Sequence, residues 1–167
     1  MPLLHKVGVT PNMLTTVSML CGLYSAKLIW DKRPREAALL FALSYFFDCM
    51  DGHMARRFNM ESHFGDWYDH ITDWLTFGLV GYALFKNNNY CKSTVIPCLI
   101  IFGFLMMNTI KWFGCQEKVY NNEIGESISL LKKFCNDPKT DLLNTKYFGV
   151  GTITVFVISL IYFSKSK

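Results

Sequence analysis

Long uncharged runs alternate with short charged stretches along this chain of 167 residues. Three runs contain no charged side chain, namely residues 7–26, 93–110 and 147–164. A helix of about 17 to 25 apolar residues crosses the hydrocarbon core of a bilayer, so each run predicts a membrane-spanning helix. The pattern therefore predicts an integral membrane protein that crosses the membrane more than once.

Two further apolar runs are too short to cross a bilayer by themselves. They comprise residues 37–47 and 74–85. Each helix spans only if it continues through the charged residues that separate the two runs. We expect one helix to open at Pro34 and continue through Ala55, and the next to begin near Gly65. Because the connection is short, these helices are antiparallel neighbours whose charged ends meet at one membrane face.

The apolar runs together predict the fold. The remaining spans are expected at about 12–30, 93–113 and 147–164. Residues 1–11 suit a short interfacial segment. The polar stretch 114–146 contains one helical apolar stripe, which indicates an amphipathic helix and consists of Ile124, Ile128, Leu131 and Cys135. The sequence therefore predicts an all-α, polytopic membrane helical bundle of about five to six transmembrane helices, a single domain over residues 1–167.

The charge and cysteine content of the chain indicate which partners to expect. The formal net charge of +4 is modest, and the basic residues lie in the expected loops. Attraction to anionic lipid head groups explains them better than nucleic acid does, so we expect membrane lipids and no nucleic acid as partners. The six cysteines show no metal-ligand spacing, and most lie in apolar runs, where cysteine behaves as a small buried hydrophobe. No cleavable signal is recognisable, so we expect the first span to be retained.

Four aspartates flank the joint between the second and third expected helices. They are Asp48, Asp51, Asp69 and Asp73. The members of each pair are three or four residues apart, so each pair projects from one helix face. Carboxylates at membrane depth are costly, and four together indicate a functional site. Oxygen ligands select Mg²⁺, Mn²⁺ or Ca²⁺ over zinc, and four carboxylates suffice for two divalent ions.

Small and basic residues accompany the aspartates. Gly52 and Gly65 remove side chains where a base or ribose could approach the backbone, and Ala55 keeps the same face narrow. Arg56 offers a fixed positive fork suited to a phosphate oxygen. An arginine that reaches lipid phosphates at the interface is the alternative interpretation of Arg56, and it stays open.

A cation or proton transporter is the alternative function, because intramembrane aspartates also mark ion pathways. A transporter predicts acidic residues spread over several helices and across the membrane, whereas these gather at one face. A carboxylate in the first turn of a helix is often only a partner for the helix dipole. This interpretation fits Asp69 but not Asp48 and Asp51, which lie near the C-terminal end of their helix.

The spacing of these residues resembles the signature of the CDP-alcohol phosphatidyltransferases at every fixed position. It reads Asp48-x2-Asp51-Gly52-x2-Ala55-Arg56-x8-Gly65-x3-Asp69-x3-Asp73. A second stretch resembles the Pro-Asn-x-Leu-Thr opening common in that family, which lies beside the nucleotide site. It reads Thr10-Pro11-Asn12-Met13-Leu14-Thr15. The close likeness covers roughly Thr10 to Trp74, and only hydrophobicity matches beyond it.

The resemblance implies a membrane-embedded helical enzyme of phospholipid synthesis, typically with six helices and often a homodimer. It implies that the four aspartates bind two divalent ions, Mg²⁺ or Mn²⁺. It further implies that the CDP moiety is held by Asn12, Gly52, Ala55, Arg56 and Gly65. Asp73 is the expected general base on the hydroxyl of an alcohol acceptor, which attacks the CDP-linked donor and displaces CMP.

The acceptor alcohol stays open. The stretch Asp51-Gly52-His53-x-Ala55-Arg56 resembles phosphatidylinositol synthases, although Trp74 stands where those enzymes often have arginine. The stretch Asp69-His70-x-x-Asp73 resembles choline and ethanolamine phosphotransferases, which use a CDP-aminoalcohol and diacylglycerol. Serine and glycerol 3-phosphate are further candidates. Membrane orientation is equally open, since basic residues lie in loops on both sides.

Overall fold

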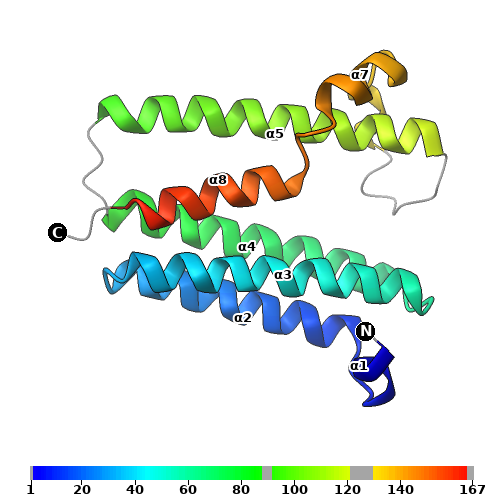
Figure 1. Ribbon diagram of the computed structural model, residues 1–167, viewed down its shortest axis with the longest axis horizontal. Coiled ribbons are helices and arrows are strands. Elements are labelled where there is room, and N and C mark those ends of the chain that lie inside the picture. The colour runs from blue at the N-terminus through cyan, green and yellow to red at the C-terminus, as the bar shows by residue number, and fades with distance from the viewer. Residues whose placement is uncertain (1, 88–91, 121–129, 165–167) are drawn as a thin grey trace. The chain divides into compact units, whose positions relative to one another are not determined.

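The structure is a computed structural model that describes residues 2–87, 92–120 and 130–164 (Figure 1). Helices make up most of these residues, and none of the described residues forms a strand, which confirms the all-α prediction. The chain divides into two compact units. The first comprises Met1–Asn89 with Ile158–Lys167, and the second Tyr90–Val157. The single domain over the whole chain stays a prediction.

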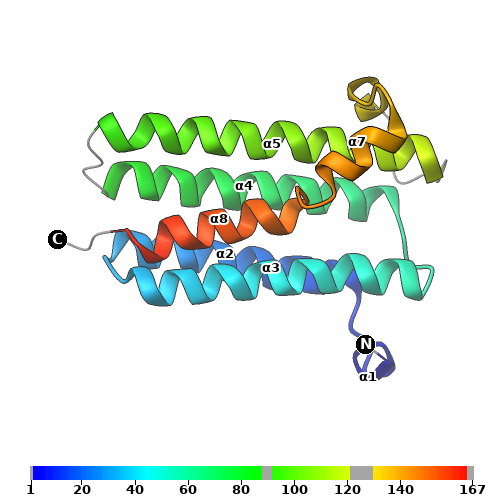
Figure 2. The ribbon, with the colours of Figure 1, turned by 45° about the horizontal axis from the view of Figure 1, so that its top comes forward.

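The first unit contains a short helix, α1 (Pro2–Lys6), and three long helices. These are α2 (Pro11–Trp30), α3 (Pro34–Arg57) and α4 (His63–Asn87). Helix α2 packs against both α3 and α4, and α3 runs antiparallel to each of them (Figures 1 and 2). The three predicted starts agree with the observed ones within two residues. As predicted, α3 and α4 continue through the charged residues that separate the two apolar runs.

Local sequence explains where α2 and α3 begin. Thr10 is extended, with φ −102° and ψ 157°, and its side-chain oxygen accepts a hydrogen bond from a backbone N–H in the first turn. Pro11 and Pro34 occupy early helical positions, where the missing N–H has no helical partner to lose. Lys32 adopts a left-handed conformation with φ 60°. Three residues therefore suffice to reverse the chain between α2 and α3.

Small hydroxyl side chains line the face of α2 that meets α3. Ser25 donates to the carbonyl oxygen of Ala37 at 2.8 Å. Ser18 and Ser44 each donate to the other's carbonyl oxygen, at 2.9 and 2.8 Å. All three serines are buried. Within a membrane, small residues let helix backbones approach closely, and each interhelical hydrogen bond contributes about 0.6 to 2 kcal/mol.

Helix α4 approaches α2 closely at Gly22. A Cβ atom added there would lie 2.2 Å from Thr76 Cγ2 and 3.1 Å from Ser44 Oγ. A Cβ atom essentially never lies as close as 2.2 Å to another heavy atom, so a larger residue here would force Thr76 to shift. Helices α3 and α4 meet through Phe41 and Phe77, whose rings pack edge to face with centroids 5.5 Å apart. The three long helices therefore share one core.

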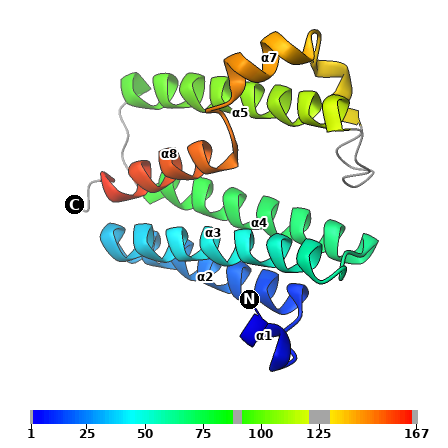
Figure 3. The ribbon, with the colours of Figure 1, turned by 45° about the vertical axis from the view of Figure 1, so that its right-hand side comes forward.

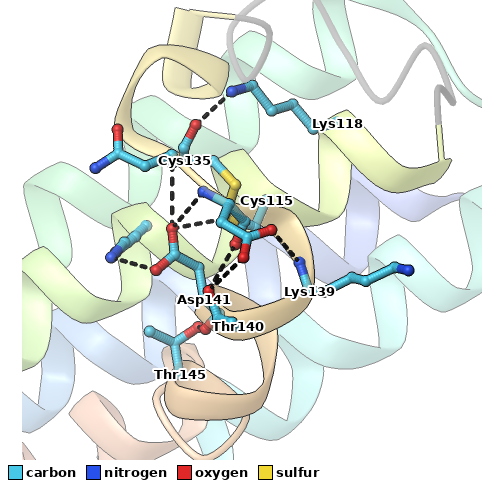
Figure 4. Close-up of a disulfide and its surroundings, with 10 residues drawn as sticks. Cys115, Lys118, Cys135, Lys139, Thr140, Asp141 and Thr145 are labelled. Atoms are coloured by element: carbon cyan, nitrogen blue, oxygen red, sulfur yellow. Dashed lines mark hydrogen bonds and ion pairs between the residues drawn. A yellow bond between two sulfur atoms is a disulfide. The ribbon is translucent and has the colours of Figure 1, made fainter.

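The second unit is built on α5 (Lys92–Tyr120). It also contains the 3₁₀ helix η1 (Leu130–Phe134), α7 (Pro138–Thr145) and the first part of α8 (Val150–Tyr162). Helix α5 packs against η1 and α7 (Figure 3). A disulfide joins Cys115 of α5 to Cys135 (Figure 4). Both cysteines are buried although they lie in the polar stretch, and their covalent pairing over 20 residues left no signal in the sequence.

Polar contacts surround this disulfide (Figure 4). Asp141 forms an ion pair with Lys111 at 2.6 Å and accepts hydrogen bonds from the N–H groups of Asn136 and Asp137 at 3.1 and 3.2 Å. Lys118 donates to the carbonyl oxygen of Cys135. These contacts hold the turn after η1 against α5.

The amphipathic helix predicted for the polar stretch is wrong where the structure describes it. Leu131 belongs to a 3₁₀ helix, and Cys135 follows that helix. The chain must turn there to pair Cys135 with Cys115 and to begin α7 at Pro138. The other two residues of the predicted stripe, Ile124 and Ile128, lie outside the described residues.

Three helical stretches of the described chain are long and apolar enough to cross a membrane. They are Pro11–Trp30, Ile96–Gln116 and Pro138–Tyr162. The first two match predicted spans. The third differs from the helix expected at 147–164, because the chain bends between α7 and α8. With 13 residues, α8 alone rises about 20 Å, which is less than a hydrocarbon core of about 30 Å. The chain is a membrane protein, and its number of spans stays a prediction.

Candidate active site

The four aspartates lie on two helices that both pack on α2. Asp48 and Asp51 lie near the end of α3, and Asp69 and Asp73 in the first half of α4. Asp51 is buried, with 5% of its surface exposed, and the other three are half-buried. Because α3 and α4 are antiparallel, the end of one helix lies beside the start of the other, and both pairs reach the same level of the unit.

The carboxylates approach one another closely. Ligand oxygens of Asp48, Asp51 and Asp69 all lie within 4.8 Å of one another. Asp73 completes the group, since its carboxyl group interacts electrostatically with those of Asp48 and Asp69. The structure therefore brings together all four residues that the sequence proposed as metal ligands.

One oxygen of this group is evidence for a bound cation. Asp69 Oδ1 is buried and has no hydrogen-bond partner among the described residues. Buried polar atoms are almost always paired, so such an atom needs an explanation. A divalent cation supplies one, because it would bind that oxygen and cancel the mutual repulsion of the carboxylates. The donor set consists only of carboxylate oxygens, which suits Mg²⁺ or Mn²⁺.

The structure also brings together two of the residues proposed to hold CDP. A Cβ atom added to Gly65 would lie 3.2 Å from Asn12 Oδ1 and 3.0 Å from Ser62 Oγ. The start of α4 and the first turn of α2 therefore meet at Gly65, with the half-buried Asn12 amide between them. The N–H of Gly65 donates to Ser62 Oγ at 3.0 Å.

The other proposed CDP contacts lie at the end of α3. A Cβ atom added to Gly52 would lie 3.3 Å from Arg56 Nη1, so the exposed Arg56 guanidinium folds back over Gly52. Ala55 is half-buried one turn after Asp51. Its carbonyl accepts a hydrogen bond from the N–H of Met60 at 2.9 Å, as α3 ends. Arg56 and Gly52 therefore form a group of their own along α3.

Sequence reasoning missed Thr15. Its hydroxyl donates to Asp51 Oδ2 at 2.6 Å, and both side chains are buried. Thr15 closes the Pro-Asn-x-Leu-Thr stretch, from which only Asn12 was proposed as a site residue. Its spacing of three residues from Asn12 places the two on one side of α2, and this was the available signal.

The chain belongs to the CDP-alcohol phosphatidyltransferase family, whose profile matches residues 8–163. This match confirms the resemblance drawn from the aspartate motif. It also extends the likeness beyond Trp74 into the second unit, where the sequence pattern alone offered only hydrophobicity.

Individual relatives match a shorter segment. The CDP-diacylglycerol–glycerol-3-phosphate 3-phosphatidyltransferases of Rickettsia typhi and Rickettsia prowazekii are each 42% identical over 64 residues, which is 38% of this chain and 34% of theirs. The CDP-diacylglycerol–serine O-phosphatidyltransferase of Mycobacterium leprae is 31% identical over 74 residues, 44% of this chain and 25% of that protein. The chain therefore matches between a quarter and 34% of the length of these relatives. No solved structure matches the chain significantly.

Proposed function

We propose that the chain is a divalent-metal-dependent phosphatidyltransferase of phospholipid biosynthesis. It transfers a phosphatidyl group from CDP-diacylglycerol to a small alcohol and releases CMP. The observation that carries this proposal is the convergence of four carboxylates, one with a buried oxygen that has no hydrogen-bond partner in the described part of the chain. The named relatives support the donor, since CDP-diacylglycerol stands in the names of both groups.

The four aspartates would hold divalent metal, and four carboxylates suffice for two Mg²⁺ or Mn²⁺ ions. Bound there, the metal supplies positive charge that neutralises the donor's pyrophosphate and stabilises charge as the phosphoryl group transfers. Asn12 and Gly65 on one side, and Gly52, Ala55 and Arg56 on the other, would hold the CDP moiety. The glycines leave room for the nucleotide, and the Arg56 guanidinium donates to a phosphate oxygen.

Asp73 acts as the general base in this scheme. It accepts the proton of the acceptor hydroxyl, whose oxygen attacks the phosphorus distal to the cytidine. A new phosphorus–oxygen bond forms to the acceptor, and the bond from that phosphorus to the CMP oxygen breaks. The products are a phosphodiester lipid and CMP.

Two alternatives remain distinguishable. A CDP-choline or CDP-ethanolamine:diacylglycerol phosphotransferase would use the same aspartates with a water-soluble donor. A cation or proton transporter would release no CMP with any donor. We further infer a multi-pass membrane arrangement, in which α3 and α4 also cross the bilayer, and a homodimer as the assembled form.

The test incubates the purified protein, in detergent, with each donor and its acceptors, and measures the CMP that is released. CDP-diacylglycerol is paired with glycerol 3-phosphate, serine or inositol, and CDP-choline or CDP-ethanolamine with diacylglycerol. We expect CMP release with CDP-diacylglycerol and one acceptor, and mass spectrometry of the lipid product then names that acceptor. Release only from a CDP-aminoalcohol would reassign the donor, and the absence of release from every pair would overturn the proposal.

Asp73→Asn separates chemistry from binding. The amide keeps the size of the side chain but cannot accept the acceptor's proton. We expect CMP release to fall at least 100-fold, in line with the contribution of about 10² to 10⁴ from general-base catalysis. Equilibrium dialysis should show CDP binding within about threefold of the wild-type affinity. Retained turnover would remove Asp73 as the base.

A further inference from the structure

Three hydroxyl residues of α2 form a row of hydrogen bonds to α3, and the bond nearest the start of α2 has a different kind of acceptor from the other two. Ser25 and Ser18 donate to backbone carbonyl oxygens of α3, at 2.8 and 2.9 Å. Thr15 donates to a side-chain carboxylate, Asp51 Oδ2, at 2.6 Å. The first two bonds hold helix to helix. The third fixes a side chain of the metal cluster.

The Thr15 hydrogen has two acceptors within reach, and the geometry favours one of them. The carbonyl oxygen of Pro11 lies 3.2 Å from Thr15 Oγ1, whereas Asp51 Oδ2 lies 2.6 Å away. A hydroxyl carries a single hydrogen, and a bond to an ionised carboxylate is shorter and stronger than one to a neutral carbonyl. Thr15 and Asp51 are only 3% and 5% exposed, so water does not compete for this bond.

This bond restricts the orientation of Asp51. With Thr15 bonded to one carboxylate oxygen, rotation of the Asp51 side chain would break a buried charge-assisted bond. Oxygen atoms of Asp51, Asp48 and Asp69 lie within 4.8 Å of one another in that orientation. The repulsion among these carboxylates would otherwise favour turning Asp51 away from the others. Thr15 therefore opposes the rotation that would dismantle the cluster before a cation binds.

The neighbouring residue ties α2 to the other carboxylate helix. Thr16 Oγ1 and the Tyr68 hydroxyl are 3.0 Å apart, and Tyr68 immediately precedes Asp69 in α4. Thr16 also donates to the carbonyl oxygen of Asn12 at 2.8 Å, so the Tyr68 hydroxyl is the donor in the shared contact. Consecutive residues of α2 thus contact α3 and α4 at the level of the aspartates.

We propose that Thr15 is a positioning residue of the metal centre, which orients the Asp51 carboxylate for binding a divalent cation. This inference rests on the proposed function, because it assigns Thr15 a role toward the metal that the aspartates would hold. Groups that hydrogen-bond metal ligands typically contribute 10- to 100-fold to metal affinity. A bond that served only to pack α2 against α3 would contribute to folding and not to metal affinity.

The experiment compares Mn²⁺ binding by wild type, Thr15→Val, Thr15→Ser and Ser25→Ala. Valine keeps the shape of threonine without the hydroxyl, and serine restores the hydroxyl without the methyl group. Ser25→Ala is the matched control, since it removes a buried α2–α3 hydrogen bond more than two turns away from the aspartates. Free Mn²⁺ is counted by electron paramagnetic resonance in detergent, without nucleotide or lipid substrate. Circular dichroism checks that each variant is folded.

We expect Thr15→Val to raise the Kd for Mn²⁺ at least 10-fold, and Thr15→Ser and Ser25→Ala to stay within about threefold of wild type. In the activity assay, Thr15→Val should need at least 10-fold more Mn²⁺ for half-maximal CMP release. At saturating Mn²⁺ its kcat should return to within about threefold of wild type, which a packing defect would not permit.

The results separate this inference from the proposed function. Equal Mn²⁺ affinity in wild type and a folded Thr15→Val would overturn the role of Thr15 and leave the metal centre intact. Should Thr15→Val not fold, Thr15→Ser decides, with Asp51→Asn as the reference variant that lacks the ligand. If Thr15→Ser bound Mn²⁺ as weakly as Asp51→Asn, the hydroxyl would not set the Mn²⁺ affinity and the role of Thr15 would be overturned. If wild type itself binds no Mn²⁺, the metal centre fails and the role of Thr15 fails with it.

Discussion

Replacing Asp48 by asparagine should stabilise the metal-free protein, although it removes a proposed ligand. The Asp48 carboxyl group faces the charges of Asp73, Asp69 and Asp51. The Asp48, Asp51 and Asp69 carboxylates approach within 4.8 Å of one another, and two unit charges at that limit repel by about 3.5 kcal/mol at an effective dielectric constant of 20. Screening reduces this figure. If only about 1 to 2 kcal/mol survives, the metal-free variant melts about 2 to 8 °C above wild type.

With metal bound, wild type should have a higher melting temperature than Asp48→Asn. A cation at about 100 times its Kd stabilises the folded protein by about 2.7 kcal/mol, which raises the melting temperature by about 5 to 11 °C. Asp48→Asn lacks one of the proposed ligands, so its melting temperature should rise by less than half as much. Thermal unfolding in detergent, followed by tryptophan fluorescence in EDTA and in graded MnCl₂, measures both effects. Asp31→Asn, at an exposed carboxylate after α2, is the control.

Two results would overturn the effects expected of Asp48→Asn. One is a melting temperature of the variant in EDTA that is equal to or below that of wild type, because removing one charge from the carboxylate group should reduce the repulsion within it. The other is a Mn²⁺-induced shift as large as that of wild type, because the metal would then bind without this ligand. The Asp31 control should match wild type in both conditions.

Two further predictions concern the packing of each unit. Gly22→Ala places a methyl group 2.2 Å from Thr76 Cγ2 and should lower the free energy of unfolding by about 1 to 3 kcal/mol, measured as a lower melting temperature. The control is Gly81→Ala, where a Cβ meets nothing within 4 Å, and it should leave the melting temperature unchanged. Cys115→Ser opens a loop of 20 residues and should cost about 3 kcal/mol, and reductant should lower the melting temperature of wild type but not of this variant. Cys98→Ser, at a free cysteine of the same helix, should remain as stable as wild type in oxidising buffer.

The sequence predicted the first unit well because its signals are local. Prolines mark the starts of α2 and α3, and short apolar runs implied helices that continue through the aspartates. The spacing of those aspartates fixed which face of each helix they occupy. Antiparallel pairing through a short connection then placed both pairs at one level, as the structure has them.

The parts that the sequence did not predict depend on contacts between distant residues. The bond from Thr15 to Asp51 joins residues 36 apart, and the disulfide from Cys115 to Cys135 joins residues 20 apart. Neither pair has a local spacing that periodicity could detect. The amphipathic stripe through Leu131 misled because the turn toward α7 overrides its helical pattern. The need for glycine at Gly22 likewise appears only once Thr76 lies against it.

We propose that the clustered aspartates bind a divalent cation that is needed to release CMP from CDP-diacylglycerol. The most direct test measures CMP release by the purified protein with the acceptor that the panel identifies, first with Mn²⁺, then with excess EDTA, and again after Mn²⁺ is restored. We expect release that EDTA abolishes and Mn²⁺ restores, and no release by Asp48→Asn under any of the three conditions. Release that persists in EDTA, or that Asp48→Asn supports at the wild-type rate, would overturn the proposed metal centre.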